Sequence, residues 1–188
     1  MVRENYRNVK EQVRLSCLKA GRDPGEVTLI AVSKTKPVSM IGELLQEGVK
    51  DLGENKPQEM KEKYELLPRD LKWHMIGHLQ RNKVKYIIDK ACLIHSLDSL
   101  RLAETIQTEA EKRNIVMPVL VEVNMAGEES KDGIPPQEAE AFIREAAKLP
   151  NLKVKGLMTI APFVDDPEDN RVHFRNLYNL FIDIKERN

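Results

Sequence analysis

The sequence contains few cysteines and no excess charge of either sign. It has 2 cysteines, Cys17 and Cys92, and neither belongs to a CxxC pair, which argues against both a disulfide framework and a zinc site. We interpret them as buried thiols. The 30 basic residues balance 30 acidic ones, so no overall field draws the chain to nucleic acid or to an anionic membrane. A small, specific ligand is the better prediction.

Long apolar runs are absent as well. The first residues, Met1 to Asn5, include no apolar signal core, and no uninterrupted apolar run reaches membrane-spanning length. We therefore expect a cytoplasmic protein without a membrane span. The 188 residues fit one domain that is large enough to bury a core. No linker or low-complexity stretch divides residues 1–188.

Short apolar segments alternate with helical patterns along the chain. Residues 27–33 are apolar without polar alternation, as expected of a strand buried on both faces of a parallel sheet. Periodicity predicts further strands at 51–54, 73–76, 93–96, 119–124 and 154–158. Six predicted strands thus alternate with helices.

The helical patterns have recognisable starts, ends and apolar stripes. An opening helix ends at Gly21, and the next follows Pro37 and ends at Gly48. Asp98 is a candidate N-cap, and Pro135 with Pro136 can open the fifth crossover helix. Other apolar stripes include Val84, Ile87 and Ile88, and finally Leu177, Leu180, Phe181 and Ile184.

Strict alternation of strands and helices predicts an α/β fold with a parallel sheet, either open or closed into a barrel. No GxGxxG follows the first strand, which removes the main support for a dinucleotide-binding sheet. A TIM-type (β/α)8 barrel is therefore favoured. Because complete barrels seldom need fewer than about 200 residues, the six predicted strands indicate a barrel that is incomplete at the C-terminus.

Lys34 is the first candidate for chemistry, because ligands of parallel α/β folds bind beyond the carboxyl ends of the strands. It directly follows the first predicted strand, where burial would disfavour the ammonium form and leave a nucleophilic amine. Neutral lysines attack aldehydes, and pyridoxal phosphate is the common aldehyde cofactor held in this way. Alternatively, Lys34 snorkels or pairs with Glu54. Lys36 shares the same strand face, so spacing does not choose between the two lysines.

Other polar residues follow the second and third predicted strands. Asn55 is suited to hydrogen-bond a ring hydroxyl, although Asn after Gly is also ordinary turn chemistry. His74 and His78 invite a metal interpretation, but no third ligand is spaced to join them, and we predict no metal site. Residues 80–83 open a predicted helix, whose amides either receive a phosphate or form a solvated basic turn.

Four motifs together resemble a known family, the YggS/PROSC pyridoxal phosphate homeostasis proteins, in order and in spacing. They are Ala-Val-Ser-Lys-Thr-Lys-Pro at 31–37, Gly-Glu-Asn-Lys-Pro-Gln-Glu at 53–59, Trp-His-Met-Ile-Gly-His-Leu-Gln-Arg-Asn-Lys at 73–83, and Gly-Leu-Met at 156–158. The resemblance implies a fold-type III barrel like the N-terminal domain of alanine racemase. It also implies pyridoxal phosphate bound as a Schiff base on Lys34, with Asn55 near the ring and His74 and Met158 lining the pocket.

The sequence departs from the family pattern after the last predicted helix. Members of the family continue through two further strands that close the barrel and hold the cofactor phosphate, and neither of their motifs is present here. We therefore expect weaker phosphate binding than in a longer chain, and two unpaired barrel edges.

The resemblance favours a non-catalytic cofactor binder that serves pyridoxal phosphate homeostasis as a monomer, with pyridoxal-phosphate-dependent enzymes as possible clients. A racemase-like enzyme is the alternative. Racemisation needs acid/base groups on both faces of the bound substrate, and none of the four tyrosines, Tyr6, Tyr64, Tyr86 and Tyr178, falls at a predicted strand end. A regulatory protein that contacts a partner through its barrel surface is the third hypothesis.

Overall fold

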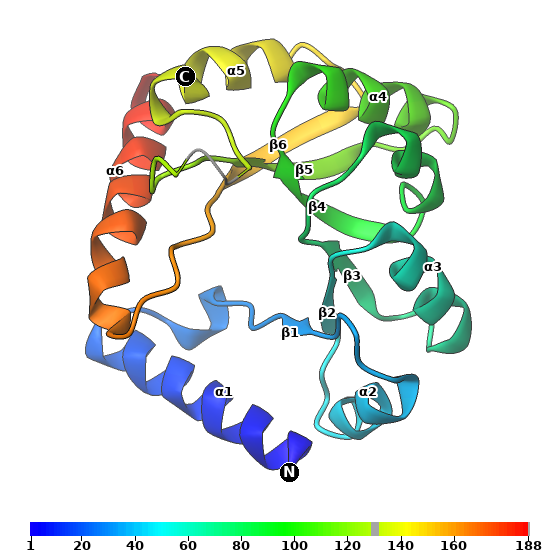
Figure 1. Ribbon diagram of the computed structural model, residues 1–188, viewed down its shortest axis with the longest axis vertical. Coiled ribbons are helices and arrows are strands. Elements are labelled where there is room, and N and C mark those ends of the chain that lie inside the picture. Colours follow the sequence, from blue (N-terminus) through cyan, green and yellow to red (C-terminus); the bar gives the residue numbers. More distant parts are fainter. Residues whose placement is uncertain (129–131, 188) are drawn as a thin grey trace.

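The computed structural model describes residues 1–128 and 132–187. Its centre is one sheet of six parallel strands whose spatial order follows the sequence (Figure 1). The strands are β1 (Ala31–Val32), β2 (Asp51–Glu54), β3 (Lys72–Met75), β4 (Ala91–Leu97), β5 (Met117–Glu122) and β6 (Leu152–Met158). Each pairs in parallel with the next. In the described part of the chain β1 and β6 do not pair, so hydrogen bonds do not close the barrel.

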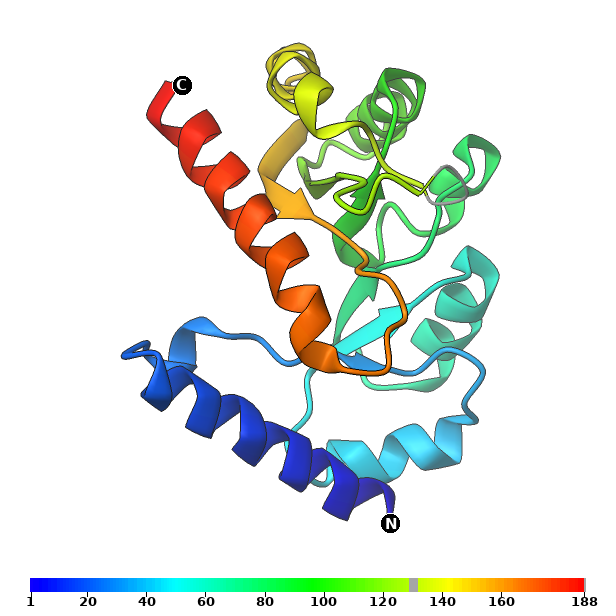
Figure 2. The same cartoon turned by 60° about the vertical axis from the view of Figure 1, so that its left-hand side comes forward.

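Helices surround this curved sheet on its outer side (Figures 1 and 2). They are α1 (Val2–Lys19), α2 (Val38–Leu45), α3 (Pro57–Leu66), α4 (Leu100–Glu111), α5 (Ala139–Ala146) and α6 (Arg171–Arg187). A 3-10 helix, η2 (Arg81–Tyr86), replaces an α-helix between β3 and β4. Within the described residues, no helix is both long enough and apolar enough to cross a membrane.

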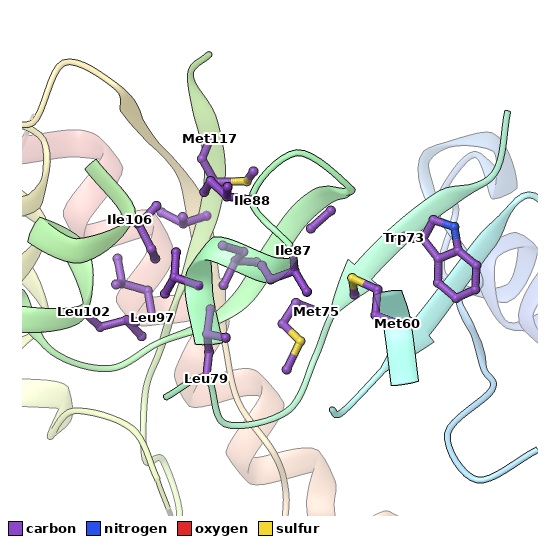
Figure 3. Close-up of a cluster of buried hydrophobic side chains, with 14 of the residues drawn as sticks. Met60, Trp73, Met75, Leu79, Ile87, Ile88, Leu97, Leu102, Ile106 and Met117 are labelled. Atoms are coloured by element: carbon purple, nitrogen blue, oxygen red, sulfur yellow. The ribbon is translucent and has the colours of Figure 1, made fainter. Parts of the chain in front are cut away.

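The apolar core lies between the sheet and its helices (Figure 3). Trp73 and Met75 lie on the face of β3 that meets Met60 of α3, and all three side chains are fully buried. Each such side chain contributes about 1.5–3 kcal/mol when it leaves water. The alternate residues of β2 and β3, including Asp51 and His74, lie on the opposite face, because side chains alternate along a strand.

The first strand is much shorter than the sequence predicted. The apolar run at 27–33 indicated a strand buried on both faces, but β1 holds only Ala31–Val32, and Val32 is 49% exposed. Ala31 pairs with Leu52, the second residue of β2. In this register residues 27–29 extend past the start of β2 and have no strand residue opposite them. The other five strands are confirmed, with bounds shifted by a few residues at most.

Two helix predictions also need correction. The stripe around Val84 belongs to the short 3-10 helix η2 and not to an α-helix. Ser99, not Asp98, caps α4 by accepting a hydrogen bond from the Leu102 amide. Pro136 opens the 3-10 turn that leads into α5, as predicted. In α6 the residues Leu177, Leu180 and Ile184 pack against the core, whereas Phe181 is exposed.

Candidate functional site

A buried charged network fixes the turn that carries Lys34. The Ser33 hydroxyl donates a hydrogen bond to Glu54 Oε1 at 2.6 Å. Lys63 of α3 donates to the same oxygen at 2.7 Å and to the Ser33 carbonyl at 2.6 Å. Ser33, Glu54 and Lys63 are all buried, so solvent does not weaken these contacts. The residue before Lys34 is therefore held firmly to β2 and α3.

The residue after Lys34 is anchored to the same network. The Thr35 amide donates to Glu59 Oε1 at 2.6 Å, and Lys63 donates to this oxygen at 2.7 Å. Burial raises the pKa of Glu59, but the hydrogen bonds from Lys63 and Thr35 outweigh it and leave that pKa below its usual value. Thr35 has φ of 61°, an uncommon conformation for a non-glycine residue. The chain therefore turns sharply at Lys34.

Lys34 itself is exposed at this turn. The sequence argument for a desolvated amine is therefore wrong, because the short strand β1 does not bury the residue that follows it. A pair between Lys34 and Glu54 is not formed either, since Lys63 occupies that carboxylate. Lys34 presents an accessible amine on a rigid backbone.

Lys36 does not share the setting of Lys34. The turn at Thr35 breaks the two-residue period on which their equivalence depended. Lys36 lines an open groove with Pro37, Lys56, Gln58 and Glu62, between the loop after β1 and helix α3, on the outer side of the sheet. Lys34 is not among the residues that line this groove. The structure thus separates two lysines that spacing could not.

Asn55 follows β2 directly beside the loop after β3. A Cβ added to Gly77 would lie 2.8 Å from Asn55 Cα and 2.8 Å from its carbonyl oxygen, so the two backbones touch here because Gly77 has no side chain. Asn55 is half-buried. In the described part of the chain the side-chain amide of Asn55 makes no hydrogen bond, so this group is available to a ligand.

His74 is buried in a polar cluster inside the barrel. Its Nδ1 lies 2.9 Å from His95 Nε2, and its Nε2 lies 3.0 Å from Asp51 Oδ1. Burial and the neighbouring His74 lower the pKa of His95 to about 4. Burial and the nearby Asp51 raise the pKa of Cys92 to about 11, so Cys92 is an inert thiol. Both ring nitrogens of His74 are engaged within the protein.

His78, in contrast, lies at the carboxyl ends of the strands. Its Nδ1 is 3.3 Å from Asp98 Oδ2 and 3.5 Å from Asp132 Oδ1. Burial and, after it, the carboxylates of Asp132 and Asp98 raise the pKa of the adjacent Glu122 to about 7, while His78 acts to lower it. The sequence offered no third ligand to join His74 and His78 in a metal site, and in the structure these two histidines belong to separate clusters.

Met158 and residues 80–83 are placed less favourably for a cofactor. Met158 ends β6, at the edge of the sheet opposite to β1, and is half-buried. Gln80 caps η2 and residues 81–83 are its first half, so this segment opens a 3-10 helix of 6 residues and not the α-helix that the sequence predicted. Sequence reasoning missed Lys63 and Glu59, although their i, i+4 spacing in a predicted helix was visible.

Comparisons with known proteins agree with this architecture. The family model for the N-terminal domain of alanine racemase matches residues 2–187. The pyridoxal phosphate homeostasis protein of Aquifex aeolicus is 47% identical over 178 residues, which is 94% of this chain and 78% of that protein. The corresponding protein of Pseudomonas aeruginosa is 35% identical over 97% of this chain and 80% of its own length.

Solved structures give the same result. A protein of unknown function from Bifidobacterium adolescentis has a TM-score of 0.89 at 34% identity, over 95% of this chain and 77% of its own. PipY of Synechococcus elongatus, solved with pyridoxal phosphate bound, has a TM-score of 0.79 at 30% identity, over 93% and 81%. Alanine racemase of Clostridium difficile, at 19% identity and a TM-score of 0.72, supports the TIM-like fold alone. This chain belongs to the alanine racemase N-terminal domain family and, within it, to the pyridoxal phosphate homeostasis proteins.

Proposed function

We propose that this chain binds pyridoxal phosphate as a Schiff base on Lys34 and holds it for pyridoxal phosphate homeostasis without catalysing a reaction. The observation that carries the proposal is the exposed amine of Lys34 on a turn whose two flanking residues are anchored by Glu54, Lys63 and Glu59. The names of the relatives and the PipY structure with pyridoxal phosphate support this choice of ligand.

The residues at the strand ends fit this ligand. Bound pyridoxal phosphate supplies an aldehyde, and a lysine amine is the group that holds an aldehyde covalently. The fixed backbone at Ser33 and Thr35 limits where the Lys34 amine can reach, which lowers the entropic cost of binding. The Asn55 amide, which has no partner among the described residues, is available to hydrogen-bond a ring substituent. Both ring nitrogens of His74 are already engaged within the protein. His74 therefore supports the pocket from inside the barrel and does not hydrogen-bond the ligand.

A non-catalytic role is favoured by the positions of the tyrosines. Tyr6 lies on α1, Tyr64 on α3, Tyr86 on η2 and Tyr178 on α6. Each therefore belongs to the helical layer and not to a strand end, where a second acid/base group would be needed for racemisation. We infer that the protein stores or delivers the cofactor.

The experiment that tests this proposal combines spectroscopy with isotope exchange. A Schiff base absorbs differently from free aldehyde, so the purified protein titrated with pyridoxal phosphate should show a new band that is lost in Lys34→Ala and kept in Lys36→Ala. Deuterium exchange at the α-carbon of D- and L-amino acids should not exceed that of free cofactor. Exchange well above this control, abolished by Lys34→Ala, would instead establish the racemase-like alternative.

We further propose that the protein acts in the cytoplasm as a monomer and passes the cofactor to pyridoxal-phosphate-dependent enzymes. Cell fractionation, light scattering and a pull-down with and without cofactor test these three statements separately. A partner retained only in one state of the cofactor would favour a regulatory switch, because a switch requires different affinities in the two states.

A further inference from the structure

Three segments that are distant in the sequence meet at the carboxyl ends of β3, β4 and β5. Leu97 pairs with Val121, so the residues that follow them, Asp98 and Glu122, are neighbours across the two strands. The Ser96 hydroxyl donates a hydrogen bond to the Gly77 carbonyl at 2.6 Å, which holds His78 beside Asp98. The backbone therefore fixes the positions of these side chains.

A fourth residue arrives from the segment that follows β5. The Ile134 amide donates to the Glu122 carbonyl oxygen at 2.9 Å, and the Asn124 amide donates to the Ile134 carbonyl at 3.0 Å. Gly133 packs so closely here that an added Cβ would lie 2.9 Å from the Asn124 nitrogen. These contacts bring Asp132 over the end of β5.

The side chains of this cluster converge on one point. One ligand atom each of His78, Asp98 and Asp132 lies within 4.8 Å of the other two. Ligand atoms bound to one zinc ion, each at about 2.0–2.2 Å, lie roughly 3–4 Å apart. A small movement of these side chains, of which His78 and Asp132 are exposed, therefore suffices to place an ion between them.

Glu122 provides independent support for a missing cation. Its side chain is buried, with 4% exposure, and within residues 1–128 and 132–187 its carboxylate has no hydrogen-bond donor and no lysine or arginine partner. Asp98 and Asp132 lie within electrostatic reach of it. Among the described residues, neither of these two carboxylates pairs with a lysine or arginine. The charged form of a buried carboxylate without a partner, next to two further carboxylates, is unfavourable unless a cation joins them.

We propose that His78, Asp98 and Asp132 bind one divalent transition-metal ion of the Zn²⁺ type, beside the buried carboxylate of Glu122. One imidazole nitrogen with carboxylate oxygens suits Zn²⁺ and Mn²⁺, whereas Ca²⁺ and Mg²⁺ prefer oxygen ligands alone. The ion links the loops after β3, β4 and β5 into one rigid rim of the barrel mouth. It does not replace the cofactor site on Lys34, which lies at the end of β1.

Calorimetric titration of Zn²⁺ into the chelator-treated full chain tests the proposal. We expect one ion per chain, with binding weakened at least tenfold in Asp98→Asn and in Asp132→Asn. Glu104→Gln, at an exposed acid of α4, should bind as the unaltered chain does. Because loss of one of several crowded carboxylates relieves repulsion, both variants should unfold no earlier than the metal-free parent, which separates lost binding from lost folding.

Two further measurements make the outcome decisive. Mn²⁺ binding followed by electron paramagnetic resonance excludes a thiolate site, since Mn²⁺ prefers oxygen ligands. His95→Gln, in the separate cluster around His74, should leave Zn²⁺ binding unchanged. Absence of binding at millimolar Zn²⁺, or binding that both aspartate variants retain, would overturn the proposal. Loss of binding in His95→Gln would assign the ion to the barrel interior instead.

Discussion

Lys63 belongs to helix α3, and its ammonium group joins the turn at Lys34 to the sheet and to this helix. It donates to the Ser33 carbonyl, to Glu54 and to Glu59. Glu54 is fully buried, and its second oxygen, Oε2, has no partner among the described residues. The carboxylate therefore depends on Lys63 and Ser33 alone, which makes this lysine both a structural residue and a positioning residue for Lys34.

Replacing Lys63 with methionine should destabilise the protein by roughly 3–5 kcal/mol, because it leaves the buried charge of Glu54 without its cation. Urea unfolding measures this loss. Lys61→Met, at an exposed position of the same helix, is the matched control and should cost less than about 1 kcal/mol. Equal effects of the two substitutions would show that the buried network does not stabilise the turn.

The lowered pKa of His95 makes its contribution to stability depend on pH. Burial lowers its pKa in the folded protein to about 4 from an ordinary value of 6.5, so the unfolded chain binds a proton first as the pH falls. The contribution of His95 to stability is full above about pH 6.5 and should decline by about 2 kcal/mol between pH 6.5 and pH 4, after allowance for partial solvent screening. The raised pKa of Glu122 changes stability in the opposite direction over a similar range. Unfolding curves of the parent and of His95→Gln at several pH values therefore isolate the His95 contribution as the difference between the two. An unchanged slope would contradict this assignment.

At the residue scale, the sequence identified the main candidates but not their contacts. Lys34, Asn55 and His74 were found because they follow or occupy predicted strands. The partners Lys63 and Asp51 were missed, because a sequence does not show which helix face meets which strand end. The same limitation hid the cluster around His78, whose third member, Asp132, lies 54 positions further along the chain (132 − 78).

Among the elements, the contact between the ends of β2 and β3 leaves no room for a side chain at Gly77. Gly77→Ala should destabilise the protein by about 1–3 kcal/mol, because the new Cβ would lie 2.8 Å from backbone atoms of Asn55. It should also weaken pyridoxal phosphate binding by displacing Asn55. Thermal unfolding and the absorbance titration measure the two effects.

Gly42→Ala is the matched control for this substitution. Gly42 lies inside helix α2 with no atom within 4 Å of an added Cβ, so alanine should raise stability by up to about 1 kcal/mol. If Gly77→Ala were as harmless as Gly42→Ala, the close approach of β2 and β3 would not position Asn55.

Element types were predictable where periodicity and neighbours agreed. The bounds of β2 match the prediction, because a segment of 4 residues between two helices has few alternatives. The predicted strand at 27–33 was too long, since apolarity does not reveal that residues 27–29 run past the start of β2. The cap of α4 shifted from Asp98 to Ser99, because both residues are good caps and only the tertiary structure decides.

For the whole molecule, the order of the sheet predicts a gradient of local stability. Strands β3, β4 and β5 each have two neighbours, whereas β1 has one neighbour and only two residues. Amide hydrogen exchange should therefore be slowest in β3 to β5 and fastest in β1, because opening β1 exposes little apolar surface. Slower exchange in β1 than in β4 would contradict the strand arrangement described above.

The fold class of the whole molecule was predictable from strict alternation of strands and helices and from the absence of GxGxxG. The structure confirms the parallel sheet and its sequential order, and the comparisons confirm the TIM-like family. Closure of the barrel depends on pairing between β1 and β6 or on strands between them, which local periodicity does not determine.

Reduction with borohydride in the presence of pyridoxal phosphate, followed by peptide mass spectrometry, tests the central claim most directly. Reduction converts a Schiff base into a stable secondary amine, so the modified residue is identified by its mass. We predict a pyridoxyl group on Lys34, absent from Lys34→Ala and retained in Lys36→Ala. Modification that persists in Lys34→Ala and disappears in Lys36→Ala would contradict the account and move the site to the groove beside α3.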